Sequence, residues 1–180
     1  DKRVLMPFAE YYPAWLALLS QRQFGGVREF SEGRPSAPLP TVAGPAAVVT
    51  CNEALFPRTV RERVGEGGGF LVNLANDGWL GVHKYSERVL DMVAQRSIEH
   101  RRYTVRASSS GGSAIIAPSG RVLSASAPFA AEVLRGEIRA RDDGTPYGRY
   151  GDWFVALCGV MVAASAARST MRRRAAGTPR

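Results

Sequence analysis

Residues 46–74 read AAVVTCNEALFPRTVRERVGEGGGFLVNL, and this stretch decides the fold. Residues 46–50 form a short, apolar and partly β-branched run, which is typical of a buried strand. Residues 58–64 carry charges in a pattern compatible with a helix, and the glycine-rich residues 65–69 end it. Residues 70–74 form a second apolar run of strand type. Strand, helix and strand in this order predict an α/β fold in which crossover helices cover a β-sheet.

The α/β pattern continues up to residue 150. Apolar residues at approximately helical spacing predict a helix over residues 85–102. Three further strands are expected at residues 103–106, 113–117 and 121–124. Pro118-Ser119-Gly120 forms the turn between the last two of them. The Gly-, Pro- and Ser-rich residues 25–44 predict a long surface loop without a stable element.

Residues 153–167 contain no charged side chain and are followed by Arg168 and the arginines of residues 172–174. Fifteen helical residues cover about 22 Å, whereas the hydrocarbon core of a bilayer is about 30 Å thick. Extension to Met171, with Arg168 snorkelling, closes most of this gap. We therefore expect a transmembrane helix over residues 151–171 and a basic cytoplasmic tail over residues 172–180. The alternative is a helix buried in a soluble core.

The net charge of +8 raises the question of nucleic-acid binding. Five of these charges lie in the acid-free tail after residue 167, which leaves +3 for the rest of the chain. No zinc-finger or helix-turn-helix pattern is present, so we expect no nucleic-acid partner. Two cysteines are too few for a disulfide framework or a zinc site, and we expect neither a metal nor a cofactor.

Six short blocks follow one another along the chain. They are KRVLMPFAEYYP (2–13), CNE with FP (51–57), NDGWLG (76–81), RSIE (96–99), the segment 106–113, and TPY before GDW (145–153). In this order they resemble the C-terminal part of apolipoprotein N-acyltransferases, which belong to the nitrilase, or carbon-nitrogen hydrolase, superfamily.

This resemblance implies a nitrilase-type α-β-β-α sandwich, of which residues 1–150 supply the C-terminal portion. It also implies a bacterial cytoplasmic (inner) membrane protein with its catalytic domain on the periplasmic face. The implied reaction moves a fatty acyl chain from a phospholipid, through a thioester on a cysteine, to the N-terminal amine of a diacylglyceryl-modified apolipoprotein. The implied partners are therefore the phospholipid donor, the apolipoprotein and the membrane.

The resemblance also assigns the catalytic residues. Cys51 matches the nucleophile, Lys2 matches the lysine of a Glu-Lys-Cys triad, and Glu10 matches a supporting acid. The glutamate that acts as general base is expected upstream of Asp1, so residues 1–180 taken alone predict little activity. A thiolate is a strong nucleophile, and its thioester is readily attacked by an amine. The alternative for Cys51 is a small buried hydrophobic residue, and for Lys2 a solvated surface lysine.

The resemblance also implies that three further residues contact substrate: Asn52, Glu53 and Trp79. Two of them have a simpler interpretation, because Trp79 fits a core aromatic and Glu53 fits a first-turn acid of a helix. Asn52 stands where the family has tyrosine, and Ser109-Ser110-Gly111 stand where it has Asn-Thr-Gly. These departures concern substrate contacts more than the type of reaction.

Two other functions compete with the acyltransferase. A soluble amidase or carbamoylase of the nitrilase superfamily shares the triad but has no membrane segment. A non-catalytic lipoprotein-binding remnant agrees with the general-base glutamate lying outside these residues. His83 and His100 belong to no motif and are expected to be structural or solvated.

Overall fold

The computed structural model describes residues 2–5, 10, 30–34, 37–77, 83–109, 112–127 and 129–176. Its centre is a six-stranded sheet in the order β1-β2-β3-β4-β5-β6. The strands are β1 (Leu39–Thr41), β2 (Gly44–Thr50), β3 (Phe70–Ala75), β4 (Thr104–Ser108), β5 (Ala114–Ile116) and β6 (Val122–Ala125). Neighbours β2, β3 and β4 pair in parallel, whereas β1, β5 and β6 join antiparallel. The sheet is therefore mixed.

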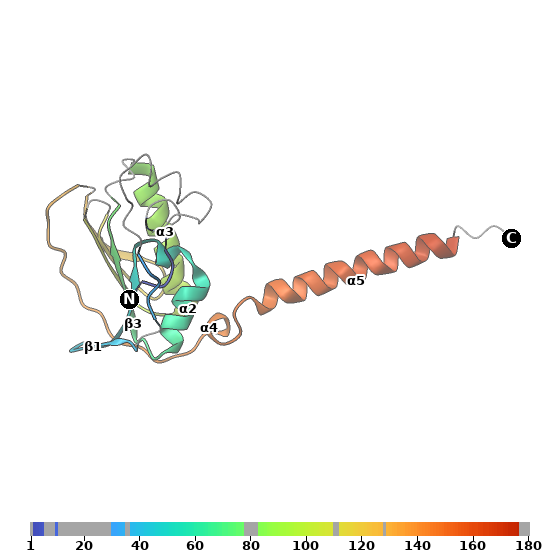
Figure 1. The fold of residues 1–180 in the computed structure, drawn as a ribbon, viewed down its shortest axis with the longest axis horizontal. Helices are drawn as coiled ribbons and strands as arrows, with labels where there is room; N and C mark the ends of the chain where they lie inside the picture. Colours follow the sequence, from blue (N-terminus) through green and yellow to red (C-terminus); the bar gives the residue numbers. More distant parts are fainter. Residues whose placement is uncertain are drawn as a thin grey trace.

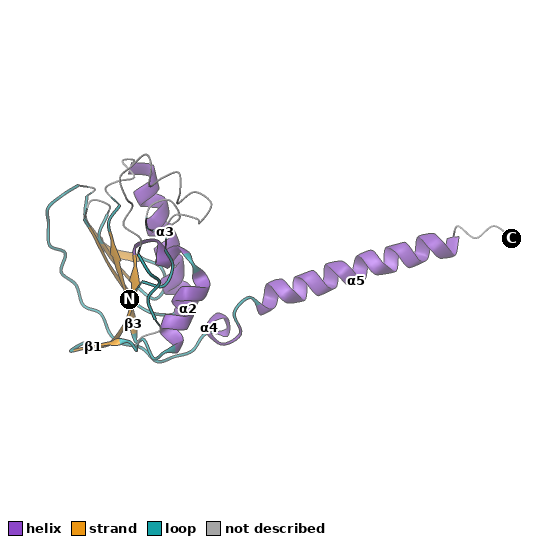
Figure 2. Ribbon diagram, in the orientation of Figure 1, coloured by secondary structure: helices purple, strands orange, loops and turns teal. Residues whose placement is uncertain are grey.

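Helices connect the parallel strands, as the alternating sequence pattern predicts. They are η1 (Cys51–Leu55), α2 (Pro57–Gly65) and α3 (His83–His100), followed after the sheet by α4 (Pro146–Tyr150) and α5 (Trp153–Ala176). Figure 2 shows α2 and α3 on one face of the sheet. The core lies between these two layers, where Val60 and Val93 of the helices pack with Val49, Leu71 and Ile116 of the strands.

The expected α/β class is confirmed, and the described residues form one sheet with a helical layer on one face. An α-β-β-α sandwich contains two such sheets, so these residues correspond to one α-β half. The predicted turn at residues 118–120 is also confirmed. Gly120 adopts a φ of +82°, a left-handed conformation that favours glycine.

The expectation of a loop without a stable element over residues 25–44 is wrong at its C-terminal end. Residues 39–41 form β1, which pairs antiparallel with the start of β2. The strands meet in a tight turn at Gly44, whose φ is +112°. Local composition favours a loop there, but pairing with a buried strand supplies the backbone hydrogen bonds. Residues 25–29 and 35–36 of this expected loop lie outside the described residues.

Helix α5 is longer than the sequence pattern alone predicts. It has 24 residues, or about 36 Å of helix. Within the described chain, Trp153–Met171 is the one helical segment that is long and apolar enough to cross a membrane, and none of it is buried against the protein. Figure 1 shows α5 projecting away from the body of the molecule. A helix buried in this domain's own core is thereby excluded, and the helix begins two residues after the expected boundary at residue 151.

Candidate active site

Cys51 lies at the carboxyl end of β2, where the strand turns directly into η1. Its φ is +52°, a left-handed conformation that residues with a side chain rarely adopt. A side chain on such a turn projects from the edge of the sheet instead of lying on either face. The Cys51 side chain is half-buried and forms no disulfide. This geometry is that of a nucleophile elbow, in which a strained turn between strand and helix presents the reactive atom.

Glu53 stands two residues after Cys51 and is fully buried. Its carboxylate accepts hydrogen bonds from the backbone N–H groups of Thr50 at 2.7 Å, Val4 at 3.1 Å and Arg3. Thr50 ends the strand before the elbow, whereas Arg3 and Val4 follow Lys2. The carboxylate therefore holds the lysine segment beside the cysteine turn. Its described partners are all backbone groups of the protein, and the expected substrate contact of Glu53 stays a prediction.

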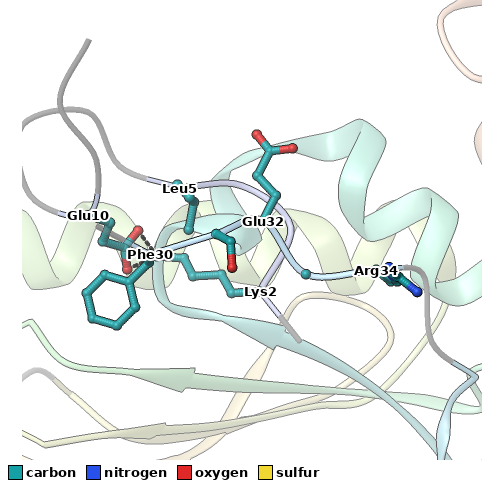
Figure 3. Close-up of a pocket in the computed structure, with 8 residues that line it drawn as sticks. Lys2, Leu5, Glu10, Phe30, Glu32 and Arg34 are labelled. Atoms are coloured by element: carbon teal, nitrogen blue, oxygen red, sulfur yellow. Dashed lines mark hydrogen bonds and ion pairs between the residues drawn. The ribbon is translucent and has the colours of Figure 1, made fainter. Parts of the chain in front are cut away.

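Lys2 and Glu10 form an ion pair in which the ammonium nitrogen lies 2.5 Å from both carboxylate oxygens. Backbone hydrogen bonds from Gly33 to Lys2 and from Phe30 to Glu10 join both residues to the segment 30–34. These residues line a cavity of about 540 Å³. Figure 3 shows the Lys2 and Glu10 side chains meeting in this cavity beside Phe30. The resemblance places Glu10 near the lysine, and the structure brings the two side chains into contact, whereas their catalytic roles stay predictions.

The other predicted site residues, Cys51, Asn52 and Trp79, lie outside the lining of the Lys2–Glu10 cavity or outside the described residues. Cys51 is not among the described residues that line the Lys2–Glu10 cavity, and it is connected to that cavity through Glu53. Asn52 is buried, and its Oδ1 atom has no hydrogen-bond partner in the described part of the chain. A buried carbonyl oxygen of this kind is costly unless a ligand or water satisfies it. Trp79 lies outside the described residues.

Three residues that sequence reasoning missed lie behind Cys51. The Asn73 amide nitrogen donates to the Cys51 carbonyl at 3.2 Å, Arg106 donates to the Asn73 side-chain oxygen, and Arg106 also pairs with Asp77. The one feature of the sequence that could have indicated this cluster is the polar Asn73 inside the apolar run of residues 70–75. Arg106 and Asp77 both stand in blocks that the resemblance includes, but spacing alone does not connect them.

His100 is buried far from this edge, at the end of α3. Burial first, then the nearby charges of Arg96, Arg102 and Arg61, lowers its pKa to about 4. Its ring packs edge-on against Tyr147. A neutral, packed histidine agrees with the structural role expected for it. The His83 side chain lies outside the described part. Among the described residues, no group of three or more His, Cys, Asp or Glu side chains is placed to hold a metal ion.

The family follows from comparison with known proteins. The model of the carbon-nitrogen hydrolase family matches residues 9–144, and the chain belongs to this family. A carbon-nitrogen hydrolase from Helicobacter pylori G27 shares the fold, with a TM-score of 0.50 at 14% identity over 57% of this chain and 43% of that one.

Within this family, the chain is similar to curated proteins that are named apolipoprotein N-acyltransferase. The apolipoprotein N-acyltransferase of Geobacter metallireducens is 35% identical over 97% of this chain and 33% of its own length. That of Synechocystis sp. is 36% identical over 87% of this chain and 30% of its own length. The chain therefore spans about a third of the curated relatives that it matches.

Proposed function

We propose that this chain is the C-terminal catalytic part of an apolipoprotein N-acyltransferase. The observation that carries the proposal is the buried Glu53 carboxylate, which joins the Cys51 elbow to the segment of Lys2. Similarity to proteins named apolipoprotein N-acyltransferase over most of the chain supports the choice of reaction within the family.

The proposed reaction has two steps. In the first, the Cys51 thiolate attacks the ester carbonyl of a phospholipid, a C–S bond forms, and the ester C–O bond breaks to release a lysophospholipid that takes up a proton. In the second, the amine of a diacylglyceryl-modified apolipoprotein attacks the thioester. An N–C bond forms, the C–S bond breaks, and the thiolate returns as the amine loses its proton to a base.

Within this reaction Lys2 stabilises the negative charge of the two tetrahedral intermediates. A positioned cation at a developing oxyanion contributes roughly 3–4 kcal/mol in acyl transfer. Glu10 accepts from the lysine ammonium and orients it. Asn52 and Trp79 are proposed to contact substrate, and the unsatisfied Oδ1 of Asn52 supports a polar contact there. A family glutamate upstream of Asp1 is proposed as the general base.

The membrane placement belongs to the same proposal. The exposed apolar surface of α5 supports a bilayer span, because such a surface is costly in water. Arginines after the span favour a cytoplasmic C-terminus, which puts the catalytic domain on the periplasmic face of the inner membrane. The same apolar surface argues against a soluble amidase. The ion pair between Lys2 and Glu10 supports an enzyme more than it supports a non-catalytic lipoprotein-binding remnant.

The test is a covalent one. The intact protein is incubated with phospholipid and without acceptor, and the mass of the Cys51 peptide is measured for an added acyl chain. We expect the adduct in the native protein, its discharge by a diacylglyceryl-cysteine peptide, and no acyl transfer by Cys51→Ala. Full activity of Cys51→Ala, or an acyl group on another residue, would overturn the proposal.

A further inference from the structure

A row of side chains crosses the three parallel strands directly behind Cys51. The strand register pairs Asn73 of β3 with Val49 of β2 on one side and with Arg106 of β4 on the other. Asn73 has no exposed surface, and Arg106 is 2% exposed. Two polar groups thus occupy positions that the surrounding sequence would fill with apolar side chains. Buried polar groups need hydrogen-bond partners, and the partners of Asn73 and Arg106 indicate the role of these two residues.

The Asn73 amide connects the row to the elbow. Its nitrogen donates to the backbone carbonyls of Val49 and Cys51, each at 3.2 Å. Its oxygen accepts from Nη1 of Arg106. A guanidinium can only donate, so the amide oxygen must face Arg106 and the NH2 group must face the two carbonyls. Arg106 therefore fixes which way the Asn73 amide points.

Arg106 is itself held on two further sides. Its Nη2 atom pairs with the buried carboxylate of Asp77, and its Nε atom donates to the Gly112 carbonyl at 3.3 Å. The Ser108 hydroxyl also donates to Asp77, at 3.2 Å. The guanidinium is planar, so these partners leave it one orientation. The Cys51 carbonyl is thus connected through Asn73 and Arg106 to Asp77.

We propose that Asn73 and Arg106 are positioning residues for Cys51, holding its left-handed turn by fixing its carbonyl. The inference rests on the proposed function, in which Cys51 is the nucleophile. A φ of +52° is unfavourable for a residue with a side chain, so the surrounding structure must impose it. Without the Asn73 donor the turn relaxes toward a negative φ, which moves the thiol from its present position. The two residues act through Cys51 and do not touch substrate.

The test measures the Cys51 thiol directly, without acyl transfer. The intact protein carries Tyr150→Cys as an exposed internal reference. It is treated with iodoacetamide, and the alkylation rates of Cys51 and of position 150 are followed separately by peptide mass. Asn73→Asp keeps an acceptor for Arg106 but turns an oxygen toward the two carbonyls. We expect the Cys51 rate to fall about tenfold, the factor that the loss of one hydrogen bond produces, while the rate at position 150 stays the same.

Arg106→Lys is the second variant. Lysine keeps the positive charge beside Asp77, but its ammonium cannot donate to Asn73 and Asp77 together in the geometry of the guanidinium. We therefore expect the Cys51 alkylation rate to fall in this variant too, but by a smaller factor. Arg102→Lys is its matched control, because Arg102 is also buried but lies just before the start of β4, at the opposite end of the parallel strands, where it donates to the Gly68 carbonyl. This control should leave the Cys51 rate unchanged even if it lowers the melting temperature.

Unchanged Cys51 alkylation in folded Asn73→Asp and Arg106→Lys would overturn the inference while leaving the acyltransferase proposal standing. An equal fall in Arg102→Lys would also overturn it, because general loosening would then explain the effect. If Asn73→Asp does not fold, Arg106→Lys and Asn73→Ser decide the matter by the same measurement. Acyl transfer by Cys51→Ala would remove the proposed function, but the alkylation rates still report whether the row holds the turn.

Discussion

Glu53 accepts a 3.1 Å hydrogen bond from the backbone N–H of Val4, which lies 49 positions earlier in the chain. The same carboxylate accepts from Arg3 and from Thr50. One buried side chain therefore joins the end of the cysteine-bearing strand to the segment of Lys2. The relative placement of the candidate nucleophile and the candidate lysine depends on this carboxylate.

Glu53→Gln should lower both stability and acyl transfer. An amide has one acceptor oxygen, so its NH2 group must face at least one of the three backbone donors. We expect the free energy of unfolding to fall by about 1–3 kcal/mol, the cost of a buried group left without its partner. Thermal unfolding in detergent measures this fall, and the rate of acyl-Cys51 formation measures the displacement of Lys2.

The matched control is Glu87→Gln, because Glu87 is exposed on α3, away from the Lys2 segment. Surface substitutions of this kind change the free energy of unfolding by at most about 0.5 kcal/mol. If Glu53→Gln is as mild as this control in both measurements, the carboxylate does not hold the two segments together.

Lys2→Met should affect chemistry more than folding. Removal of one positioned donor from an oxyanion costs about 100- to 1,000-fold in rate, and we expect acyl-Cys51 formation to slow by that factor. The melting temperature should change little, because the Lys2–Glu10 pair is partly exposed. Arg58→Met makes the same change of charge at an exposed site and should keep the native rate. A Lys2→Met protein that acylates Cys51 at the native rate would contradict the role given to Lys2.

The secondary structure could largely be predicted because its signals are local. The apolar run before Cys51 and the helical spacing of residues 85–102 each report their own segment, and the structure confirms both as β2 and α3. The short strand β1 could not be predicted in this way. Its three residues are exposed and gain their hydrogen bonds only by pairing with β2.

The candidate site was predicted less completely, for a physical reason. Lys2, Glu10 and Cys51 stand in short sequence blocks that resemble the family, and the resemblance alone names them as candidates. Asn73 and Arg106 act through hydrogen bonds set by the register of β3 with β4, and register is a tertiary property. No spacing along the chain indicates that residues 33 positions apart share a hydrogen bond.

His100 should make the protein less stable in acid. Its folded pKa of about 4 is below its ordinary value of 6.5, mainly because it is buried and also because Arg96, Arg102 and Arg61 lie nearby. The unfolded chain therefore takes up a proton between pH 6.5 and pH 4 while the folded chain resists it. The stability that the neutral histidine contributes is present above pH 6.5 and falls by about 3 kcal/mol as the pH approaches 4.

His100→Gln removes this titration, so its stability should depend less on pH between 6.5 and 4. Thermal unfolding of both proteins across this range gives the difference. Burial raises the pKa of the neighbouring Glu99, which acts in the opposite sense, and the comparison with the variant isolates the histidine. Parallel pH profiles for the two proteins would mean that His100 is not held neutral.

Gly68 and Gly65 should respond oppositely to alanine. A Cβ atom at Gly68 would clash with the Ala47 Cβ, at a separation that real Cβ atoms do not adopt, whereas a Cβ at Gly65 meets nothing within 4 Å. We expect Gly68→Ala to lower the free energy of unfolding by about 1–3 kcal/mol. Gly65→Ala, at the end of α2, should be neutral or slightly stabilising. Equal effects in thermal unfolding would contradict the close packing of Gly68 on β2.

The proposed membrane orientation of α5 predicts which cysteine positions react with a reagent added from the periplasmic side. Cys51→Ser and Cys158→Ser first remove the native cysteines. A single cysteine is then introduced by Tyr150→Cys, just before the helix, or by Ala175→Cys, near the end of the helix. A membrane-impermeant maleimide added to intact cells with a permeabilised outer membrane should label Tyr150→Cys, because the catalytic domain is proposed to face the periplasm. Ala175→Cys should label only after the inner membrane is opened, because the arginines of residues 172–174 favour the proposed cytoplasmic location of that end. The reverse pattern would invert the topology, and labelling of both sites in intact cells would mean that α5 does not span the bilayer.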